Sequence, residues 1–437
     1  MSVDKTSVNV DKTPEPDGDT PVVNPEAATA AVTAVDPRLL VREQGLLGYW
    51  SEFKRKMKAG ELGSLPVVLG LAIICIIFQV LNSEFLSAQN ISNITVTMVG
   101  TGMISVGIVF VLLLGEIDLS VGSVSGAASA LAAVLTVNQG WPEWVAVLVA
   151  IAAGALIGAL HGFFFAVLGA PAFAVTLAGL LFWLGFMLKV LGEDGTINLD
   201  SEGLIGKLTT YTFTDLAAAY GLALVVVVLF FVSSFLGNRR REAAGVPSRP
   251  LSDTVLRTVL LAVVSFAAAY MYNQYKGLPL ATVIFLAFLV GTDFLLRRTS
   301  YGRKIFALGG SVEASRRAGI NVTAVRISVF GISGGFAAIG GLFLASKIAS
   351  ANQSAGTGDL LMNAIAAAVI GGTSLFGGRG RTWNALLGVL VIVSIQYGLQ
   401  LESIAEPVKY MITAAVLLTT VVIDSVTRKT QKTAGRA

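Results

Sequence analysis

The chain has 437 residues, of which 54% are hydrophobic and only 13% are charged, and its mean hydropathy is +0.75. Soluble domains contain about 25% charged residues, so this chain carries too much apolar surface for a water-soluble core. Its single cysteine, Cys75, excludes a disulfide framework, and one cysteine with one histidine excludes a His/Cys metal cluster. The net charge of +4 would suit a nucleic-acid partner, but the positions of the basic residues exclude one.

The first sixty residues differ in composition from everything that follows. Residues 1–37 contain five prolines among Thr, Asp, Ala and Val, and are predicted to form a disordered cytoplasmic tail without a cleavable signal peptide. Residues 38–58 are polar and basic with Tyr49, Trp50 and Phe53 interleaved, which favours a short helix lying on the membrane lipid surface. A nucleic-acid arm is the alternative for this segment, and nothing else in the chain supports it.

From residue 65 onward, apolar runs alternate with short polar breaks. Each run approaches the ~20 residues that a helix needs to cross the hydrocarbon core. Helices are expected, since lipid offers no partner for unpaired backbone groups. The fold class predicted is an all-α, polytopic membrane helix bundle, with a transmembrane domain at 61–425 and a cytoplasmic C-terminal tail at 426–437. About twelve transmembrane helices are expected, at Leu65–Leu81, Ile94–Leu114, Leu119–Val137, Val145–Leu168, Ala172–Leu191, Leu216–Leu236, Thr258–Tyr272, Leu280–Leu296, Ile327–Ile348, Leu360–Phe376, Trp383–Leu401 and Val408–Asp424.

The basic residues are distributed unevenly between the two ends of these predicted helices. With the N-terminus inside and the helices alternating in direction, 26 of the 31 Lys and Arg residues fall on the cytoplasmic side. Cytoplasmic loops of membrane proteins carry such an excess of Lys and Arg. We therefore expect both termini in the cytoplasm, and this topology explains the positive net charge without a nucleic-acid partner.

Groups that could supply energy or chemistry are scarce in the predicted helices. No G-x-x-x-x-G-K-[ST] phosphate loop occurs, so energy, if the chain uses any, is expected to come from another subunit. Ion-coupled transporters usually keep ionisable residues at mid-membrane, whereas the charged residues here lie near predicted helix ends. A Cys–His nucleophile is not favoured either, so the chain is expected to be no enzyme and to need no cofactor or metal.

The stretch GEIDLSVGS, residues 115–123, places two carboxylates directly after an apolar run. Asp118 immediately precedes the next predicted helix and is a candidate N-cap, and Glu116 is close enough to interact with the positive end of that helix. The alternative is that this pair gates or lines the inner end of a transport path. A catalytic acid–base pair is excluded, because no nucleophile, metal ligand or cofactor motif accompanies the carboxylates.

Glycines four residues apart recur in the predicted helices, a spacing that lets helices pack backbone to backbone. They are Gly122 and Gly126; Gly154, Gly158 and Gly162; and Gly331 and Gly335. His161, the only histidine, lies within the second set in GALHGFFF. A structural role in packing and hydrogen bonding is favoured for it, and lining of a pathway is the alternative.

The loop between the eighth and ninth predicted helices, residues 300–326, is amphipathic. A short helix through Glu313 is predicted to end at Gly319, a residue that suits a helix C-terminus. A merely solvated loop is the alternative. The mixture of apolar and charged residues favours a cytoplasmic coupling helix that fits the groove of a partner subunit.

Four segments in this order resemble the membrane permeases of bacterial ABC sugar importers, a family that includes ribose, xylose and multiple-sugar permeases. They are GEIDLSVGS (115–123), PAFAVTLAGLLFW (171–183), GRKIFALGGSVEASRRAGI (302–320) and IGGTSLFGGRGRTWNALLG (370–388). The resemblance covers residues 94–401. Residues 237–298 look like the extra loop and hairpin that lengthens the xylose-type permeases, whereas the N-terminal tail and His161, where asparagine is expected in many relatives, depart from the pattern.

The resemblance implies a permease subunit in the bacterial inner membrane, paired with a second permease copy, driven by a cytoplasmic ABC ATPase and supplied by an extracytoplasmic sugar-binding protein. A xylose-type monosaccharide is the favoured substrate; ribose, galactose, a nucleoside or another small polar solute is the alternative within the family, and an ion-coupled secondary transporter is the alternative class. The candidate residues for a substrate pathway or gate are Glu116, Asp118, His161, Phe173 and Thr176. The candidate residues for coupling to the ATPase are Gly302, Arg303, Glu313, Ala314, Gly319 and Ile320.

Two short segments hint at an internal repeat. GEIDLSVG (115–122) and GGTSLFGG (371–378) share Gly, Leu and Gly at their first, fifth and eighth positions, and each follows an apolar run. Transporters are often built from repeated halves, so an internal repeat is one interpretation of this match, though not the favoured one. Coincidence among such frequent residues is the alternative.

Overall fold

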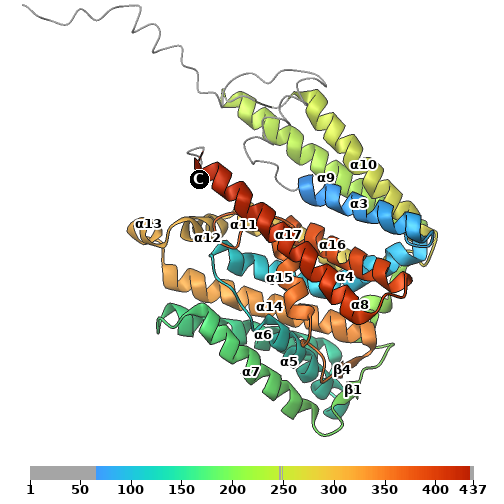
Figure 1. Cartoon of the computed structure of the whole chain (residues 1–437), viewed down its shortest axis with the longest axis vertical. Coiled ribbons are helices and arrows are strands. Elements are labelled where there is room, and N and C mark those ends of the chain that lie inside the picture. Colours follow the sequence, from blue (N-terminus) through green and yellow to red (C-terminus); the bar gives the residue numbers. More distant parts are fainter. Residues whose placement is uncertain (1–64, 246–247, 249, 434–437) are drawn as a thin grey trace, which may run out of the picture.

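The computed structural model describes residues 65–245, 248 and 250–433. Each of the twelve predicted spans contains a helix, and the axes of the long helices are roughly aligned in one bundle (Figure 1). They are α3 (Leu65–Leu81), α4 (Ala88–Leu113), α5 (Val121–Ala133), α6 (Glu143–Ala166), α7 (Ala172–Leu191), α9 (Leu216–Ala243), α10 (Leu251–Asn273), α11 (Leu280–Arg298), α14 (Val322–Ile348), α15 (Leu360–Ile370), α16 (Thr382–Leu401) and α17 (Glu406–Thr433). The predicted N-terminal tail and surface helix lie outside the described residues, as do residues 434–437.

Within the described part, nine helices are long and apolar enough to cross a membrane, and α3 and α15 are shorter apolar helices. The π-helix η1 (Val134–Asn138) extends α5 to complete one of the nine. Strand content is slight: β1 (Thr196–Asn198) pairs antiparallel with β4 (Ser350–Asn352), and β2 (Thr212–Phe213) pairs with β3 (Leu278–Pro279). The prediction of an all-α polytopic membrane protein is confirmed.

Short elements mark the two ends of the bundle. Helices α12 (Ser300–Gly310) and α13 (Val312–Arg317) project at one end, and α8 (Leu204–Thr210) lies with β1 and β4 at the other (Figure 1). We call these the coupling end and the strand end. The amphipathic loop of the sequence therefore forms two short helices that stand apart from the long ones.

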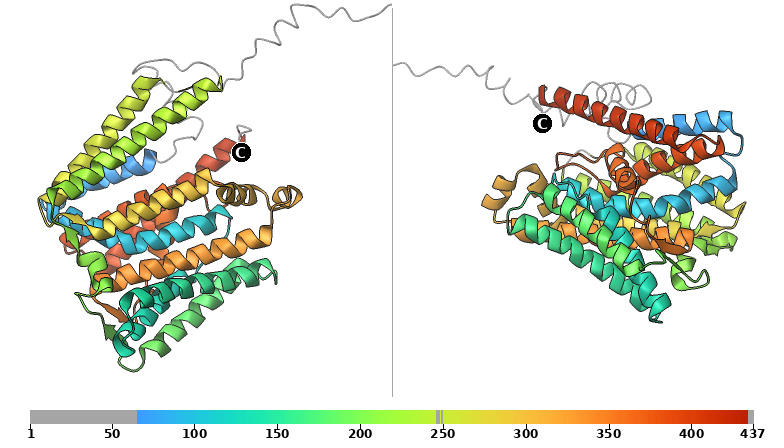
Figure 2. Two further views of the ribbon diagram at one scale, coloured as in Figure 1. Left: turned by 180° about the vertical axis from the view of Figure 1, so that it is seen from behind. Right: turned by 60° about the horizontal axis from the view of Figure 1, so that its bottom comes forward.

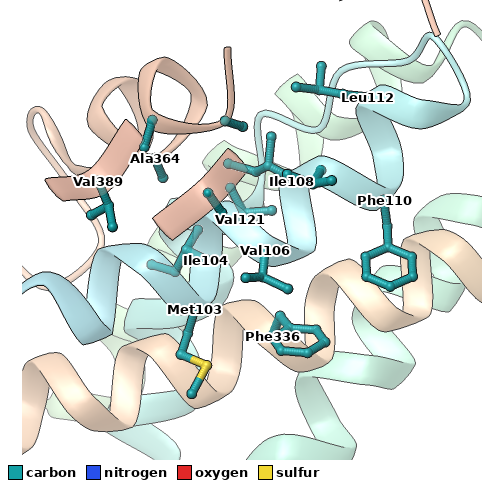
Figure 3. Close-up of a cluster of buried hydrophobic side chains, with 14 of the residues drawn as sticks. Met103, Ile104, Val106, Ile108, Phe110, Leu112, Val121, Phe336, Ala364 and Val389 are labelled. Atoms are coloured by element: carbon teal, nitrogen blue, oxygen red, sulfur yellow. The ribbon is translucent and has the colours of Figure 1, made fainter. Parts of the chain in front are cut away.

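Helix α4 lies at the centre of the bundle, and 94% of its apolar 18-residue stretch is buried inside the structure. Figure 3 shows its side chains, among them Met103, Ile104 and Phe110, packed beside Phe336 of α14 and Val389 of α16. Full burial explains why α4 is apolar on every face: each side of the helix contacts protein.

Helices α6 and α14 pack with their backbones in contact. A Cβ atom added at Gly158 would overlap the Phe330 carbonyl, and one added at Gly334 would overlap the Gly154 carbonyl. Only glycine leaves room for this approach, so the close packing predicted from the glycine spacing is confirmed for these helices.

Helices α9 and α10 form an antiparallel pair at the edge of the bundle, which Figure 2 shows from behind. They share a small apolar cluster that includes Ala219, Ala223 and Tyr272. Helix α11, in contrast, places Phe285 and Leu289 in the main core. The segment 237–298 is therefore divided in the structure, with α10 at the edge and α11 in the bundle.

Several helix boundaries differ from those predicted. Helix α15 ends at Ile370, six residues before the predicted Phe376, because Gly372 has a φ of 102°, which no α-helix contains. Helix α17 continues to Thr433, into the segment predicted as a C-terminal tail. Helix α5 begins at Val121 and not at Leu119, a difference that matters for the site.

Candidate functional site

The turn between α4 and α5 holds a buried carboxylate. Gly115 has a φ of 81°, which reverses the chain after α4, and the Asp118 side chain is only 2% exposed. Its Oδ1 atom accepts hydrogen bonds from the backbone N–H of Ser120 at 2.9 Å and from the Ser120 hydroxyl at 2.6 Å. Asp118 therefore closes a turn before the helix.

The predicted N-cap role of Asp118 is wrong. The residue at the N-cap of α5 is Ser120, and it makes no side-chain capping bond. The helix starts two residues later than the apolar run suggested, because Leu119 and Ser120 belong to the turn that Asp118 organises.

A chain of hydrogen bonds connects Asp118 to three other helices. The Ser333 hydroxyl of α14 donates to Asp118 Oδ2 at 3.2 Å. His161 Nδ1 of α6 lies 3.1 Å from the Ser120 hydroxyl oxygen, and the Trp183 indole N–H of α7 donates to His161 Nε2 at 3.1 Å. We call Asp118, Ser120, His161, Trp183 and Ser333 the inner polar cluster; it connects the α4–α5 turn with α6, α7 and α14.

The directions of these hydrogen bonds follow from the donors available. An indole nitrogen can only donate, so His161 Nε2 must accept and carries no proton. The neutral ring is then protonated at Nδ1 and donates to the Ser120 oxygen, while the Ser120 hydroxyl proton points to Asp118. Each polar group of the cluster therefore has a partner, as buried polar groups require.

The cluster lies inside the bundle. Ser333 is seven residues beyond Arg326 on α14, which is about 10 Å along the axis at 1.5 Å per residue. His161 is 4% exposed. Gly179 of α7 leaves space for the imidazole, since a Cβ atom there would lie 2.7 Å from His161 Cε1.

The structure brings together most of the predicted pathway residues. Asp118 and His161 share the cluster, and the buried Thr176 hydroxyl lies 3.5 Å from the Ile117 carbonyl oxygen in the same turn. Phe173 does not join them; it is 57% exposed on the outer face of α7. Nothing in the sequence pointed to Ser333, which lies in a run of small residues on a helix that was predicted only to pack.

Glu116 lies beside the cluster but faces a different partner. Burial raises the pKa of its carboxyl group above the usual range, and the positive charge of Arg326 acts in the opposite direction. The Arg326 guanidinium also lies 4.3 Å from the centre of the Phe165 ring at the end of α6. Arg326 thus contacts α6 and acts electrostatically on the α4–α5 turn.

Helices α12 and α13, which we call the coupling helices after the role predicted for their segment, are short, and each has its own N-cap. Thr299 accepts a hydrogen bond from the Gly302 N–H at the start of α12, and Ser311 accepts one from the Ala314 N–H at the start of α13. Side-chain caps of this kind stabilise a helix by about 1 kcal/mol. These caps therefore fix the N-terminal ends of two helices that are too short to be stable in isolation.

Helix α13 ends in the predicted glycine stop. Gly319 has a φ of 78°, its N–H donates to the Arg316 carbonyl, and the Ile320 N–H donates to the Ser315 carbonyl. This pair of bonds is the Schellman arrangement, which satisfies the last carbonyls of a helix. The prediction of a helix end at Gly319 is confirmed.

The predicted coupling residues fall into two groups. Arg303, Glu313, Ala314 and Gly319 are exposed on the projecting helices, where a partner could reach them. Gly302 is buried and Ile320 half-buried, and a Cβ atom at Gly302 would overlap the backbone of Leu296.

Helix α12 contacts the α4–α5 turn through a junction of glycines. The Gly378 N–H donates to the Leu113 carbonyl at the end of α4, and a Cβ atom at Gly309 of α12 would overlap that same carbonyl. A Cβ atom at Gly377 would lie 2.9 Å from the Gly115 nitrogen. The two segments suspected of being a repeat thus pack against each other, and α12 covers their contact.

Comparison with known proteins agrees with this architecture. The protein family described as "branched-chain amino acid transport system / permease component" matches residues 90–421. The chain belongs to this permease family.

The xylose transport system permease protein of Escherichia coli K12 is 34% identical over 359 residues, covering 82% of this chain and 90% of that protein. The ribose import permease protein of Bacillus subtilis 168 is 30% identical over 374 residues, covering 86% of this chain and 96% of that protein. No solved structure matches the permease significantly.

The xylose transport system permease protein of Haemophilus influenzae Rd is also similar, with 32% identity over 86% of this chain and 99% of its own length. Membership of the family places the projecting helices and the buried cluster in a polytopic transport protein.

Proposed function

We propose that this permease is the transmembrane subunit of an ATP-driven importer that takes up a monosaccharide, with a xylose-type sugar favoured. The observation that carries the proposal is the similarity to xylose permeases over more than four-fifths of the chain. The ribose permeases are similar at slightly lower identity. Ribose, galactose, a nucleoside or another small polar solute is the second choice of substrate.

A separate cytoplasmic ATPase supplies the energy in this proposal. The sequence contains no phosphate-binding loop of its own. Helices α12 and α13 project from the coupling end. Glu313 forms ion pairs with Arg316 and Arg317 on the exposed face of α13. Such a face suits the groove of a partner that closes on ATP binding.

The remaining parts of the assembly follow from the family resemblance. An extracytoplasmic binding protein delivers the sugar at the strand end, and a second permease copy completes the path. The chain sits in the bacterial inner membrane with both termini in the cytoplasm, an orientation supported by the 26 basic residues on that side.

The inner polar cluster acts as the inner gate of this path. Its hydrogen bonds connect α6, α7 and α14 to the α4–α5 turn, so opening a passage between these helices requires the bonds to be exchanged. Exchange of one buried hydrogen bond for another, or for one to water, costs little, whereas leaving a group unpaired costs about 1–3 kcal/mol. The cluster can therefore alternate between closed and hydrated states.

Uptake of labelled xylose by proteoliposomes tests the proposal. We expect the permease, its ATPase and its loaded binding protein to accumulate xylose only with ATP, and to do so after ionophores have collapsed the ion gradients. Uptake that stops with the gradients would point to an ion-coupled secondary transporter. Competition by unlabelled ribose, galactose or nucleosides then ranks these solutes by how strongly each reduces the uptake of labelled xylose.

Cysteine labelling tests the orientation. In a Cys75→Ser background, a cysteine placed at Asn198 in β1 should react with a membrane-impermeant reagent in intact cells, and one placed at Ser248 between α9 and α10 should not. Labelling at Ser248 alone would reverse the proposed orientation.

A further inference from the structure

A second polar site lies near the strand end, between α16 and the start of α17. It is a cavity of about 140 Å³ whose lining residues are all polar. They are Asp359, Gln396, Gln400, Glu406, Lys409, Tyr410 and Thr413. We call this cavity the α16–α17 pocket, and neither the gate nor the coupling helices include it.

The polar residues occupy matching faces of the two helices. Gln396 and Gln400 are four residues apart on α16, and the four α17 residues follow at intervals of three, one and three, so each set lies on one helical face. Gln396 and Gln400 lie within one predicted span (383–401) and Lys409, Tyr410 and Thr413 within another (408–424), whereas Asp359 and Glu406 lie just outside the predicted spans. Polar side chains within a span are costly and often mark the path of a substrate or ion, so this pair of polar faces is a candidate binding site.

Four of these seven side chains have no hydrogen-bond partner among the residues that the structure describes. Lys409 pairs with Glu406 at 2.6 Å, and Asp359 accepts a hydrogen bond from Asn363 at 2.7 Å. The other four lining side chains make no hydrogen bond to any described residue: Gln396, Gln400, Tyr410 and Thr413. Two amides, a phenol and a hydroxyl thus offer both donors and acceptors to a molecule in the pocket.

The balance of donors and acceptors identifies the class of ligand. Another cavity near this end, of about 290 Å³, is lined by the carboxylates of Glu143 and Asp200, by Thr136, whose hydroxyl already donates to a carbonyl, and by Trp141, whose indole N–H is its one further side-chain donor, so its side chains offer more acceptors than donors. The α16–α17 pocket also contains two carboxylates, but Glu406 is paired with Lys409 and Asp359 already accepts a bond from Asn363, and two amides, a phenol and a hydroxyl add donors and acceptors side by side. Sugar hydroxyls also do both, so this lining complements a neutral polyhydroxyl compound better than an ion.

The volume agrees with a small ligand. At about 30 Å³ of liquid per water molecule, the cavity holds about five waters, which is the space of a small solute and not of an oligosaccharide. We propose that the α16–α17 pocket binds a monosaccharide as it enters the permease from the strand end. This proposal rests on the proposed function, since it takes the transported sugar as the ligand.

Saturation-transfer NMR on the purified permease with D-xylose tests the pocket directly. We expect transfer from the wild-type protein to the sugar protons, and a clear loss of that transfer in the Gln396→Leu/Gln400→Leu double variant. Neither glutamine has a hydrogen-bond partner among the described residues, so the substitutions leave none of these residues' polar groups unpaired and the variant should fold. Gln139→Leu, an exposed and equally unpaired glutamine after η1, is the matched control and should resemble wild type.

Transport supplies the second measurement. In proteoliposomes with ATPase and loaded binding protein, the double variant should take up less xylose per ATP hydrolysed, by about fivefold for each hydrogen bond lost, with stimulated ATPase activity retained. Equal transfer and equal uptake in wild type and double variant would overturn the pocket. A wild-type permease that shows pocket-dependent transfer but no ATP-driven uptake would keep the pocket and overturn the proposed function.

Discussion

The Ser333 hydroxyl donates a hydrogen bond to Asp118 across 3.2 Å, although 215 positions separate the two residues in the chain. Ser333 belongs to α14, which begins at Val322, only two residues after the Schellman turn of α13. A displacement of α13 by a partner subunit would therefore be transmitted along one continuous helix to the carboxylate of the inner polar cluster. This relationship provides a physical route between the two proposed sites.

The glycine junction offers a second route, and Gly309→Ala tests it. The added methyl group would overlap the Leu113 carbonyl, so α12 must move away from the end of α4. Overpacking costs about 1–3 kcal/mol, which is roughly 5–150-fold in a coupled equilibrium. We expect a loss of xylose uptake within that range, measured per folded permease.

Gly310→Ala is the control for this junction, because a Cβ atom at Gly310 meets nothing within 4 Å. It should keep wild-type uptake. Equal uptake by the Gly309 and Gly310 variants would show that α12 does not act through its contact with α4.

Gly179→Ala tests the space kept for His161. The new methyl group would displace the imidazole and break its bonds to Trp183 and Ser120. We expect a lower thermal unfolding midpoint, since the clash and the stranded indole N–H together cost about 1–3 kcal/mol or more.

Gly185→Ala lies on the same helix and meets no atom within 4 Å. Replacing glycine by alanine in a helix interior stabilises by roughly 0.5–1 kcal/mol, so this variant should unfold at or slightly above the wild-type temperature. If both variants shift the unfolding midpoint equally, the contact between Gly179 and His161 is not what decides stability.

Gly319→Val tests the end of the coupling helix. A β-branched residue in the left-handed region costs about 1–2 kcal/mol, which is a factor of roughly 5–30 in population. No atom lies within 4 Å of a Cβ atom there, so the effect is conformational and not steric. Transport and ATPase stimulation should fall in Gly319→Val and recover in Gly319→Asn, because asparagine adopts this conformation more readily. Wild-type uptake in Gly319→Val would count against a coupling role for α13.

The helices were predictable because their signal is local. Apolar runs of membrane length gave all twelve segments, and the bounds of α3 and α7 match those predicted. The errors arose at turns. Helix α15 was predicted too long because glycines in an apolar run look like helix until their φ angles are known.

The inner polar cluster was less predictable, because it depends on contacts between distant segments. The sequence drew attention to Asp118 and His161 through their rarity among apolar residues. Ser120, Trp183 and Ser333 resemble ordinary packing residues in the sequence, and only the fold places their hydrogen-bonding atoms together. Periodicity located the helices, but it could not show which serine faces a buried carboxylate.

The charge of Asp118 is the feature of the cluster with the clearest test. The carboxylate accepts three hydrogen bonds, two at Oδ1 and one at Oδ2. In Asp118→Asn, the amide oxygen can keep both bonds from Ser120, and the amide nitrogen can donate to the Ser333 hydroxyl, which is able to accept. We expect Asp118→Asn to fold with little loss of stability.

Asp118→Leu has the opposite expectation. It leaves the Ser120 N–H and both serine hydroxyls without their acceptor, at about 1–3 kcal/mol for each group that stays unpaired. The yield of folded permease should therefore fall. Folded yield in detergent and xylose uptake per folded permease separate the two effects: Asp118→Asn with normal folding and reduced uptake would show that the negative charge serves the transport cycle. Normal uptake in Asp118→Asn would instead show that the negative charge is not needed for transport and that Asp118 acts only through its hydrogen bonds.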